Sequence, residues 1–419
     1  MHTLRLFAGF ILGCFFAVAA LVTLQYLVDP YDYLHLRTLP GVNAQKPYMY
    51  ENARLTKPQA ISREKPRGLI LGGSTVEGGF DPTHPALERY QPVYNAALPS
   101  GRLYESYRIL QHALARSDID IAIVSLDFIN WIGFSRIKAS VFDEQEMAVA
   151  FDGTPNVLAG SPQSLHNLFN RRVLGNGLVT LSYQDTRVLR NGTTRERFPP
   201  HWYLPNGQRT HDSSLRYGIA YGGFDGPFNR FMKAQYGRLK TIDHAAPFPA
   251  RVAGGDYFDL LEQFVRLSAE NDFRLVFVLP PCHITFLETI RKAGVWDEFQ
   301  QFKRRVVAKV DHADKSQGTR VPVYDFCVFE MPNAEPILSR EFQLKPPSSF
   351  WDPAHLSDAT GDLALTIMLG DLLPEGDFGV DLGKEPDLDA FFARDLERRL
   401  SMQKAFPAEF AAIDLALSE

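Results

Sequence analysis

A serine early in the chain and an acid–histidine pair near its end are the residues of this sequence best suited to catalysis. Ser74 follows an apolar run and two glycines, whereas Asp352 and His355 lie three residues apart, directly after Trp351. A serine hydroxyl attacks a carbonyl group when a base takes its proton, which an imidazole does near neutral pH. A carboxylate on the other imidazole nitrogen holds the ring in the required tautomer. The three residues therefore predict catalysis through an acyl-serine.

The segment around Ser74 has the pattern of a strand that ends in a sharp turn. Residues 68–71 are short and apolar, and the glycines that follow let the backbone turn tightly. A serine at that point lies at the carboxyl end of a strand, where open α/β sheets keep their ligands. Two phosphate-binding motifs are excluded, because the glycine loop is not followed by a Lys-Ser/Thr pair and does not have the pattern G-x-G-x-x-G. The nucleophile elbow of the α/β-hydrolases needs a glycine where this chain has Val76.

Strand-like and helix-like segments alternate along most of the chain. The runs rich in β-branched and aromatic residues predict strands, and segments with helical periodicity lie between them. This alternation predicts an α/β fold, with a parallel sheet between two helical layers in a three-layer α/β/α arrangement. The expected strands are 68–71, 92–95, 119–126, 273–279 and 321–326, and the expected helices are 83–90 (capped by Thr83), 103–116, 257–271, 286–310, 357–373 and 388–402.

The first 28 residues predict a membrane anchor. Residues 6–24 contain no charge, and an uncharged stretch of this length can cross a hydrocarbon core of roughly 30 Å. Arg5 and the amino terminus favour a cytoplasmic N-terminus and an exported remainder. Cleavage after Ala19, or a lipoprotein site at Cys14, are the alternatives, but the apolar run continues to Val28 and favours an uncleaved signal anchor. The expected organisation is an anchor at 1–28, a stalk at 29–66, the main domain at 67–375 and a helical extension at 376–419.

Residues 127–249 break the regular pattern and read as an insertion in the main domain. Its loops either cover one end of the sheet and hold a substrate or form short helices packed away from any ligand. The net charge of −5, without basic blocks, argues against a nucleic-acid partner. Cys282 and Cys327 each follow a predicted strand, and buried free thiols are expected rather than a disulfide. The cysteine spacing indicates no metal site, and no cofactor is expected.

With these motifs the chain resembles the SGNH (GDSL-like) hydrolase superfamily. In that family the first block ends a strand with the nucleophilic serine and the last block is D-x-x-H, so the resemblance implies that Ser74 is the nucleophile and that Asp352 and His355 are the acid and the base. The family's second block, N-x-G-x-x-G, corresponds to residues 95–100, where Asn95 matches. Alanine and serine stand at the two glycine positions, and Gly101 follows directly.

The second and third blocks of this family supply groups that stabilise the oxyanion. In this chain Ser100 stands where the family has a backbone N–H donor, and Asn95 is expected either near the oxyanion or as a residue that orders the loop. Asp127 replaces the asparagine of the third block, G-x-N-D, which falls at residues 125–128. A carboxylate cannot donate a hydrogen bond unless it is protonated, so Asn130 or another group is expected to take that role.

Two aromatic side chains near these motifs have open roles. His283 follows a predicted strand and either lines the same cleft or serves the structure, the second being favoured. Trp351 packs on the catalytic histidine, on a sugar, or in the core.

The anchor, the insertion and the altered blocks make the chain similar to one branch of this superfamily, the membrane-anchored periplasmic proteins related to the alginate O-acetylation proteins. This resemblance implies a flavodoxin-like strand order and a place in the bacterial inner membrane, with one span and a periplasmic domain. It also implies a polysaccharide substrate and a membrane-bound O-acyltransferase as partner. The expected activity is transfer or hydrolysis of O-acyl groups, chiefly acetyl. The alternative is a catalytically silent protein that binds polysaccharide or assists an export or acetylation complex.

Overall fold

The described part of the chain folds around a mostly parallel sheet. The computed structural model describes residues 2–134, 136–157, 170–184, 202–211, 223–249, 252, 255–339, 347–370, 372–373 and 376–418. Its six strands lie in the order β2-β1-β3-β4-β5-β6, and only β6 runs antiparallel to its neighbour. The strands are β1 (Gly68–Leu71), β2 (Val93–Asn95), β3 (Ile121–Ser125), β4 (Arg274–Leu279), β5 (Val323–Asp325) and β6 (Val380–Asp381). The predicted α/β class and parallel sheet are thus confirmed.

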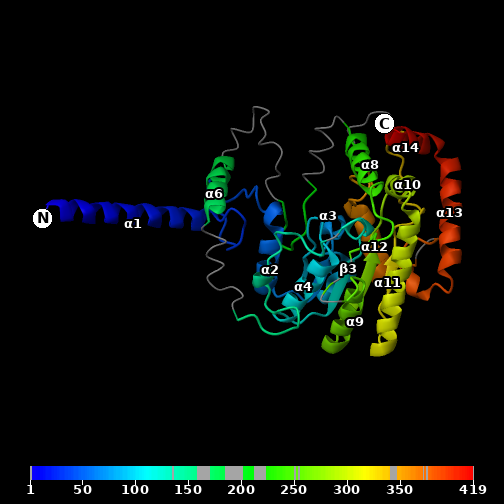
Figure 1. The fold of residues 1–419 in the computed structure, drawn as a ribbon, viewed down its shortest axis with the longest axis horizontal. Helices are drawn as coiled ribbons and strands as arrows, with labels where there is room; N and C mark the ends of the chain where they lie inside the picture. Colours follow the sequence, from blue (N-terminus) through cyan, green and yellow to red (C-terminus); the bar gives the residue numbers. More distant parts are fainter. Residues whose placement is uncertain are drawn as a thin grey trace.

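The sheet separates two apolar cores. Successive side chains of a strand point to opposite faces, so Leu69 and Leu71 enter one core while Ile70 enters the other. Long helices contribute to each core from opposite faces of the sheet (Figure 1). These helices are α4 (Leu103–Leu114), α9 (Asp259–Asn271) and α11 (Trp296–Gln317) on one side and α12 (Asp358–Leu369) on the other. Burial on both faces explains why these strands are continuously apolar.

Several helices differ from their sequence predictions. The helix expected at 286–310 is two helices, because Gly294 adopts a φ of +80° between them. Residues 85–90 form a 3-10 helix capped by His84 rather than an α-helix capped by Thr83. The expected stalk contains a helix with buried residues, α2 (Ala53–Glu64). The remaining helices are α3 (Ser74–Gly79), α6 (Arg171–Tyr183), α8 (Asp225–Leu239), α10 (Ile284–Lys292), α13 (Leu388–Ala405) and α14 (Pro407–Ser418).

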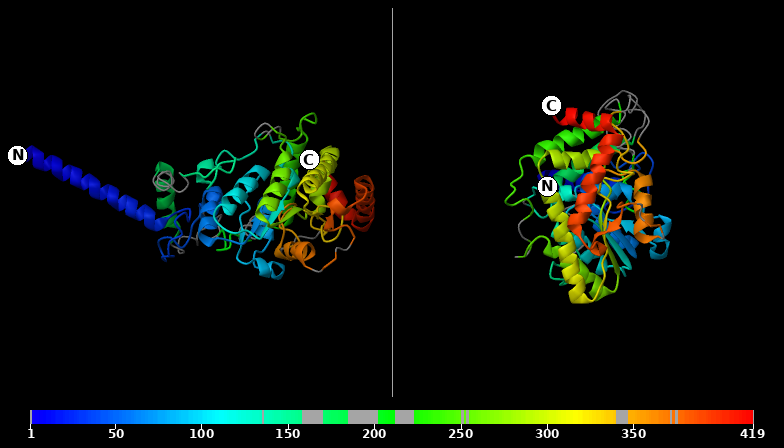
Figure 2. Two further views of the ribbon diagram at one scale, coloured as in Figure 1. Left: turned by 90° about the horizontal axis from the view of Figure 1, so that it is seen from below. Right: turned by 90° about the vertical axis from the view of Figure 1, so that its right-hand side faces the viewer.

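The N-terminal helix, α1 (His2–Val28), projects from the globular part (Figures 1 and 2). Within Arg5–Val28, the most apolar stretch of 18 residues has a mean hydropathy of 2.4 and is not buried by the described chain. By length and composition, this helix can cross a membrane.

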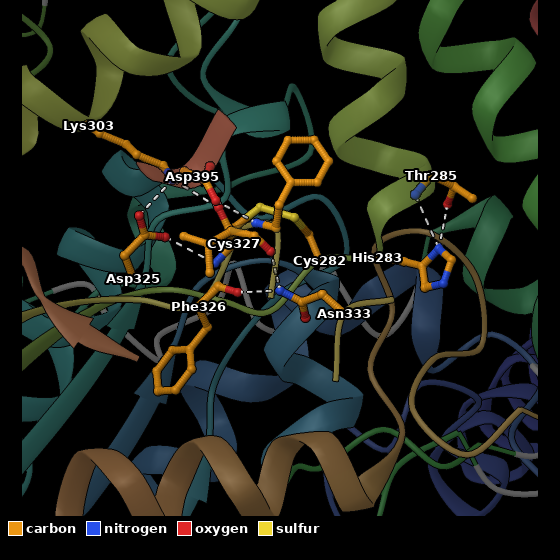
Figure 3. Close-up of a disulfide and its surroundings, with 11 residues drawn as sticks. Cys282, His283, Thr285, Lys303, Asp325, Phe326, Cys327, Asn333 and Asp395 are labelled. Carbon is orange, nitrogen blue, oxygen red and sulfur yellow. Dashed lines mark hydrogen bonds and ion pairs between the residues drawn. A yellow bond between two sulfur atoms is a disulfide. The ribbon is translucent and has the colours of Figure 1, made fainter. Parts of the chain in front are cut away.

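A disulfide joins the ends of two neighbouring strands. The Sγ atoms of Cys282 and Cys327 are bonded at 2.02 Å, so the expectation of free thiols is wrong (Figure 3). The cysteines follow β4 and β5, which are adjacent and parallel, and this pairing brings the two residues together. Beside Cys327, Lys303 and Asp325 form a buried ion pair at 2.6 Å, and the Lys303 ammonium also donates to the Cys327 carbonyl at 2.9 Å.

Candidate active site

Ser74, His355 and Asp352 form a continuous chain of hydrogen bonds. Ser74 Oγ lies 2.9 Å from His355 Nε2, and His355 Nδ1 lies 2.6 Å from Asp352 Oδ2. The serine is the first residue of α3, whereas the acid and the histidine lie in the loop before α12. Because the Asp352 carboxylate accepts, Nδ1 carries the proton and Nε2 is left to accept from the serine. Ser74 and His355, which are 281 residues apart in sequence, are therefore in direct contact.

Close packing between α3 and α12 holds the two halves of this chain together. A Cβ atom on Gly79 would lie 2.6 Å from Leu356 Cβ, and one on Gly361 would lie 1.5 Å from the Gly79 carbonyl oxygen. Only glycine fits at both positions, because larger residues would push the helices apart. This contact fixes the distance between Ser74 and the histidine loop.

The Asp352 carboxylate is held in its ionised form by its surroundings. Burial by itself would raise the pKa of Asp352, but the nearby His355 ring and its hydrogen bond outweigh that effect. The backbone N–H groups of Ala354 and His355 also donate to Asp352 Oδ1, at 2.9 and 3.0 Å. The net result is a pKa below the ordinary value of 3.8. The carboxylate is thus charged and oriented toward the imidazole at neutral pH.

The turn before Ser74 packs tightly against two neighbouring loops. Gly72 has a φ of +140°, and a Cβ atom there would lie 2.4 Å from Ser125 Cβ. A Cβ atom on Gly101 would lie 2.1 Å from the Gly72 carbonyl oxygen. The carboxyl ends of β1, β2 and β3 therefore converge behind the serine, as the sequence motifs predict.

Asp127 lies next to the serine turn as an acceptor. Its Oδ2 accepts from the Gly73 N–H at 3.2 Å and from Ser125 Oγ at 2.6 Å. Burial raises the pKa of Asp127, although hydrogen bonds from Ser125, Thr75 and Gly73 oppose this rise. The residue therefore orders the loop before Ser74.

The residues of the second block support the serine loop through contacts that occupy their polar groups. Asn95 is fully buried, and its Nδ2 donates to the carbonyls of Val76 at 2.9 Å and Phe80 at 3.1 Å. The Gly101 N–H donates to the Leu98 carbonyl at 2.9 Å. These contacts favour a loop-ordering role for Asn95 and leave neither group free for an oxyanion. Ser100 is exposed and adopts a positive φ of 50°.

Asn130 approaches the serine turn from the end of β3. A Cβ atom on Gly73 would lie 2.6 Å from Asn130 Nδ2 and 2.9 Å from Asp127 Oδ2, so both side chains close over this glycine. Among the contacts of the described residues, Asn130 uses its backbone N–H to reach the Asp127 carbonyl at 2.8 Å. Its side-chain amide nitrogen therefore lies beside the turn that precedes Ser74.

A buried ionic network surrounds Glu77, one helical turn along α3 from Ser74. Glu77 Oε1 accepts from Tyr203 Oη at 2.7 Å and from Lys57 Nζ at 3.3 Å. Lys57 also donates to the carbonyls of Ala97 and Gly207, and burial lowers its pKa to about 8. Sequence reasoning missed this network, because its members come from the expected stalk, the serine helix and the insertion.

Part of the insertion packs directly on the candidate site. In residues 202–211, the Arg209 N–H donates to the Glu77 carbonyl at 2.8 Å. Downstream, the His211 ring bonds to Asp358 at 2.7 Å and stacks on Trp351 at 5.1 Å. The insertion thus joins the serine helix to the histidine loop, while residues 158–169, 185–201 and 212–222 lie outside the described residues.

Two aromatic residues singled out from the sequence have mainly structural contacts. His283 is fully buried and caps α10, with Nδ1 bonded to Thr285 and Nε2 to the Glu335 carbonyl at 2.7 Å. Its backbone N–H donates to the Pro353 carbonyl at 3.0 Å, which ties this turn to the histidine loop. Trp351 stacks on His211 instead of on His355.

A small cavity lies beside the serine turn, between Asp127, Thr75 and the disulfide. Its volume is about 30 Å³, with room for about one water molecule. Within the described ranges, no cluster of three His, Cys, Asp or Glu residues has the arrangement of a metal site.

Comparison of the chain with protein-family models gives no match, and comparison with curated proteins gives no match either.

Proposed function

We propose that this chain is a membrane-anchored serine acyltransferase or acyl esterase of the SGNH type, which acts on O-acyl groups of an exported polysaccharide. The observation that carries the proposal is the hydrogen-bonded chain from Ser74 through His355 to Asp352, with distances of 2.9 and 2.6 Å. A nucleophile, a base and an orienting acid in this order are the minimum set for acyl transfer.

In the first half-reaction, Ser74 Oγ bonds to the ester carbonyl carbon while its proton passes to His355 Nε2. The Asp352 carboxylate stabilises the imidazolium that forms. The intermediate then collapses, the bond to the leaving oxygen breaks, and His355 returns the proton to that oxygen. Ser74 is left acylated and the alcohol departs.

In the second half-reaction, a hydroxyl group gives its proton to His355 Nε2 and attacks the carbonyl carbon of the acyl-serine. The bond between that carbon and Ser74 Oγ then breaks, and His355 returns the proton to Ser74 Oγ. Water yields hydrolysis and a sugar hydroxyl yields transfer, so one site serves both reactions. The negative charge on the carbonyl oxygen needs donors. We assign this role to the Ser74 backbone N–H and to the Asn130 amide, in place of Asn95 and Gly101, whose polar groups are occupied.

The compartment and the acyl group follow from separate observations. A disulfide between Cys282 and Cys327 is typical of proteins in an oxidising compartment, which supports a globular domain on the periplasmic side of an inner-membrane anchor. Acetyl is the acyl group that we favour, because the resemblance to the alginate O-acetylation proteins implies it. A membrane-bound O-acyltransferase would be the donor partner.

A catalytically silent, polysaccharide-binding protein is the second candidate. It is favoured by one feature, the Asp127 carboxylate at the position where the resembled family has an oxyanion-binding asparagine. Hydrolysis of para-nitrophenyl acetate by the full chain in detergent, beside a Ser74→Ala variant, separates the two. The enzyme predicts turnover that the variant loses. Equal background rates for both proteins would favour the silent candidate.

A further inference from the structure

Helix α6 lies where the membrane span meets the globular domain. Gln25, near the end of α1, donates from Nε2 to the Val173 carbonyl at 3.1 Å. A Cβ atom on Gly177 would lie 2.1 Å from Gln25 Oε1, so only glycine permits this approach. In Figures 1 and 2, α6 lies beside the end of α1 and runs across its direction. A helix that crosses the end of a membrane span lies roughly parallel to the bilayer plane.

The length of the span sets the depth of α6. The distance from Leu6 to Gln25 along an α-helix is about 30 Å, because each residue rises about 1.5 Å. This matches the hydrocarbon thickness of a bilayer, which is also roughly 30 Å. Gln25 therefore lies at the edge of the hydrocarbon, and α6, which contacts it, lies in the interface.

The faces of α6 differ in character. Val173, Gly177 and Thr180 are buried against the rest of the chain. Leu174, Leu178 and Leu181 recur with helical spacing on the next face, and the Leu178 side chain is 60% exposed. Leu178 is exposed and Leu174 and Leu181 are partly exposed, so this stripe beside the membrane span is placed to contact an apolar phase.

The leucine stripe points back toward the span. Asn176 Nδ2 donates at 2.9 Å to the hydroxyl of Tyr31, which follows the end of α1. At about 100° per residue, Leu178 lies nearly opposite Asn176 on the helix. Since Asn176 faces the chain beyond the span, Leu178 faces the bilayer. Arg171, exposed at the start of α6, is placed for lipid phosphates, whereas Arg172 lies 3.9 Å from Glu51.

We propose that α6 is an interfacial helix that lies in the outer surface of the membrane with Leu174, Leu178 and Leu181 among the acyl chains. The proposal rests on the membrane anchoring proposed above. It gives the tethered domain a second contact with lipid, so that the site is held in a fixed orientation over the bilayer instead of swinging on a single helix.

Fluorescence of a single labelled cysteine in lipid nanodiscs tests the proposal. Leu178→Cys, in full-length protein carrying Cys14→Ser, is labelled with the environment-sensitive dye NBD, while the native disulfide stays oxidised. The nanodiscs contain phosphatidylcholine and phosphatidylglycerol, with and without lipid that carries a doxyl quencher near the headgroup. Leu415→Cys is the matched control, because Leu415 is 63% exposed on α14, far from α1.

We expect the Leu178 label to emit at shorter wavelength than the Leu415 label and to be quenched at least roughly threefold more strongly by the doxyl lipid, as burial at the acyl boundary requires. Equal emission and quenching at the two sites would overturn the proposal. A shielded but unquenched Leu178 label would also overturn it and would indicate a protein partner on this face. Labelling native Cys14 in a separate sample, in nanodiscs whose doxyl group lies near the end of the acyl chain, checks the span itself: an unquenched label there means that the anchoring fails, not only the placement of α6.

Discussion

Two polar residues one turn apart on α3 are used in opposite ways. Ser74 joins a hydrogen-bonded chain, here called the front chain, whose histidine and aspartate side chains are 22% and 21% exposed. Glu77 is fully buried between Lys57 and Tyr203. The front chain stays partly accessible, whereas the network around Glu77 is closed and fixes the helix in place. The comparison suggests that the insertion supports the serine helix, because Tyr203 and Arg209 belong to it.

The largest expected effect is the loss of the front chain. His355→Ala should lower kcat for acetyl ester hydrolysis by about ten-thousand-fold or more, because the serine loses its base. Asp352→Asn should lower kcat by a similar factor, because the amide cannot hold the required tautomer. Steady-state kinetics with para-nitrophenyl acetate measures both. Unchanged kcat with either variant would show that the front chain is not catalytic.

The next largest effect concerns the buried ion pair between Lys57 and Glu77. Lys57→Met leaves the Glu77 charge buried without its ammonium partner, which should lower the free energy of unfolding by about 3–5 kcal/mol. Denaturant unfolding measures this change. Glu64→Gln is the matched control, because its ion pair with Arg63 is exposed on the same helix and should matter by less than about 1 kcal/mol.

A double variant sharpens this test. Adding Glu77→Gln to Lys57→Met removes the stranded charge, so stability should partly return. Equal and additive losses would contradict the proposed coupling between Lys57 and Glu77.

A smaller effect is expected from loss of the disulfide between Cys282 and Cys327. Cys282→Ser with Cys327→Ser should lower the free energy of unfolding by about 2–4 kcal/mol, because the bridge closes a loop between residues 45 apart. Treatment of the wild type with dithiothreitol should lower its stability by the same amount relative to the oxidised protein, as measured by thermal unfolding. A double variant as stable as the oxidised protein would exclude a bridge in solution.

The smallest effect is a pH dependence at Asp127. The pKa of Asp127 is higher in the folded chain than the ordinary 3.8. At pH values between the unfolded and the folded pKa, the folded state therefore binds more protons than the unfolded state, and stability falls as pH rises through this range. Asp127→Asn removes this loss and should gain stability over the wild type as pH rises above 3.8. Denaturation at several pH values measures the difference. A constant difference at all pH values would mean that the Asp127 pKa is not raised.

The sequence allowed the strands that carry the site to be predicted, together with the three residues that meet there. β1 begins and ends at the predicted residues, because Gly72 and Gly73 interrupt a purely apolar run. The pairing of Ser74 with His355 followed from chemistry, since a serine without a base is unreactive.

Features that depend on distant partners could not be predicted. Lys57 meets Gly207 across 150 residues, and neither position carries a local pattern that indicates the other. The disulfide escaped prediction because it depends on the adjacency of β4 and β5. Helix α2 was missed because its apolar residues show little helical periodicity. Its Lys57 is buried only because partners from distant parts of the chain surround it.

Labelling with a fluorophosphonate is the most direct test of an activated serine at position 74. The account predicts that the reagent modifies Ser74 in the folded wild type, as mapped by peptide mass spectrometry, and that heat-denatured protein and the His355→Ala variant are not modified. Absence of label on Ser74 in folded protein, or equal labelling of the His355→Ala variant, would contradict it.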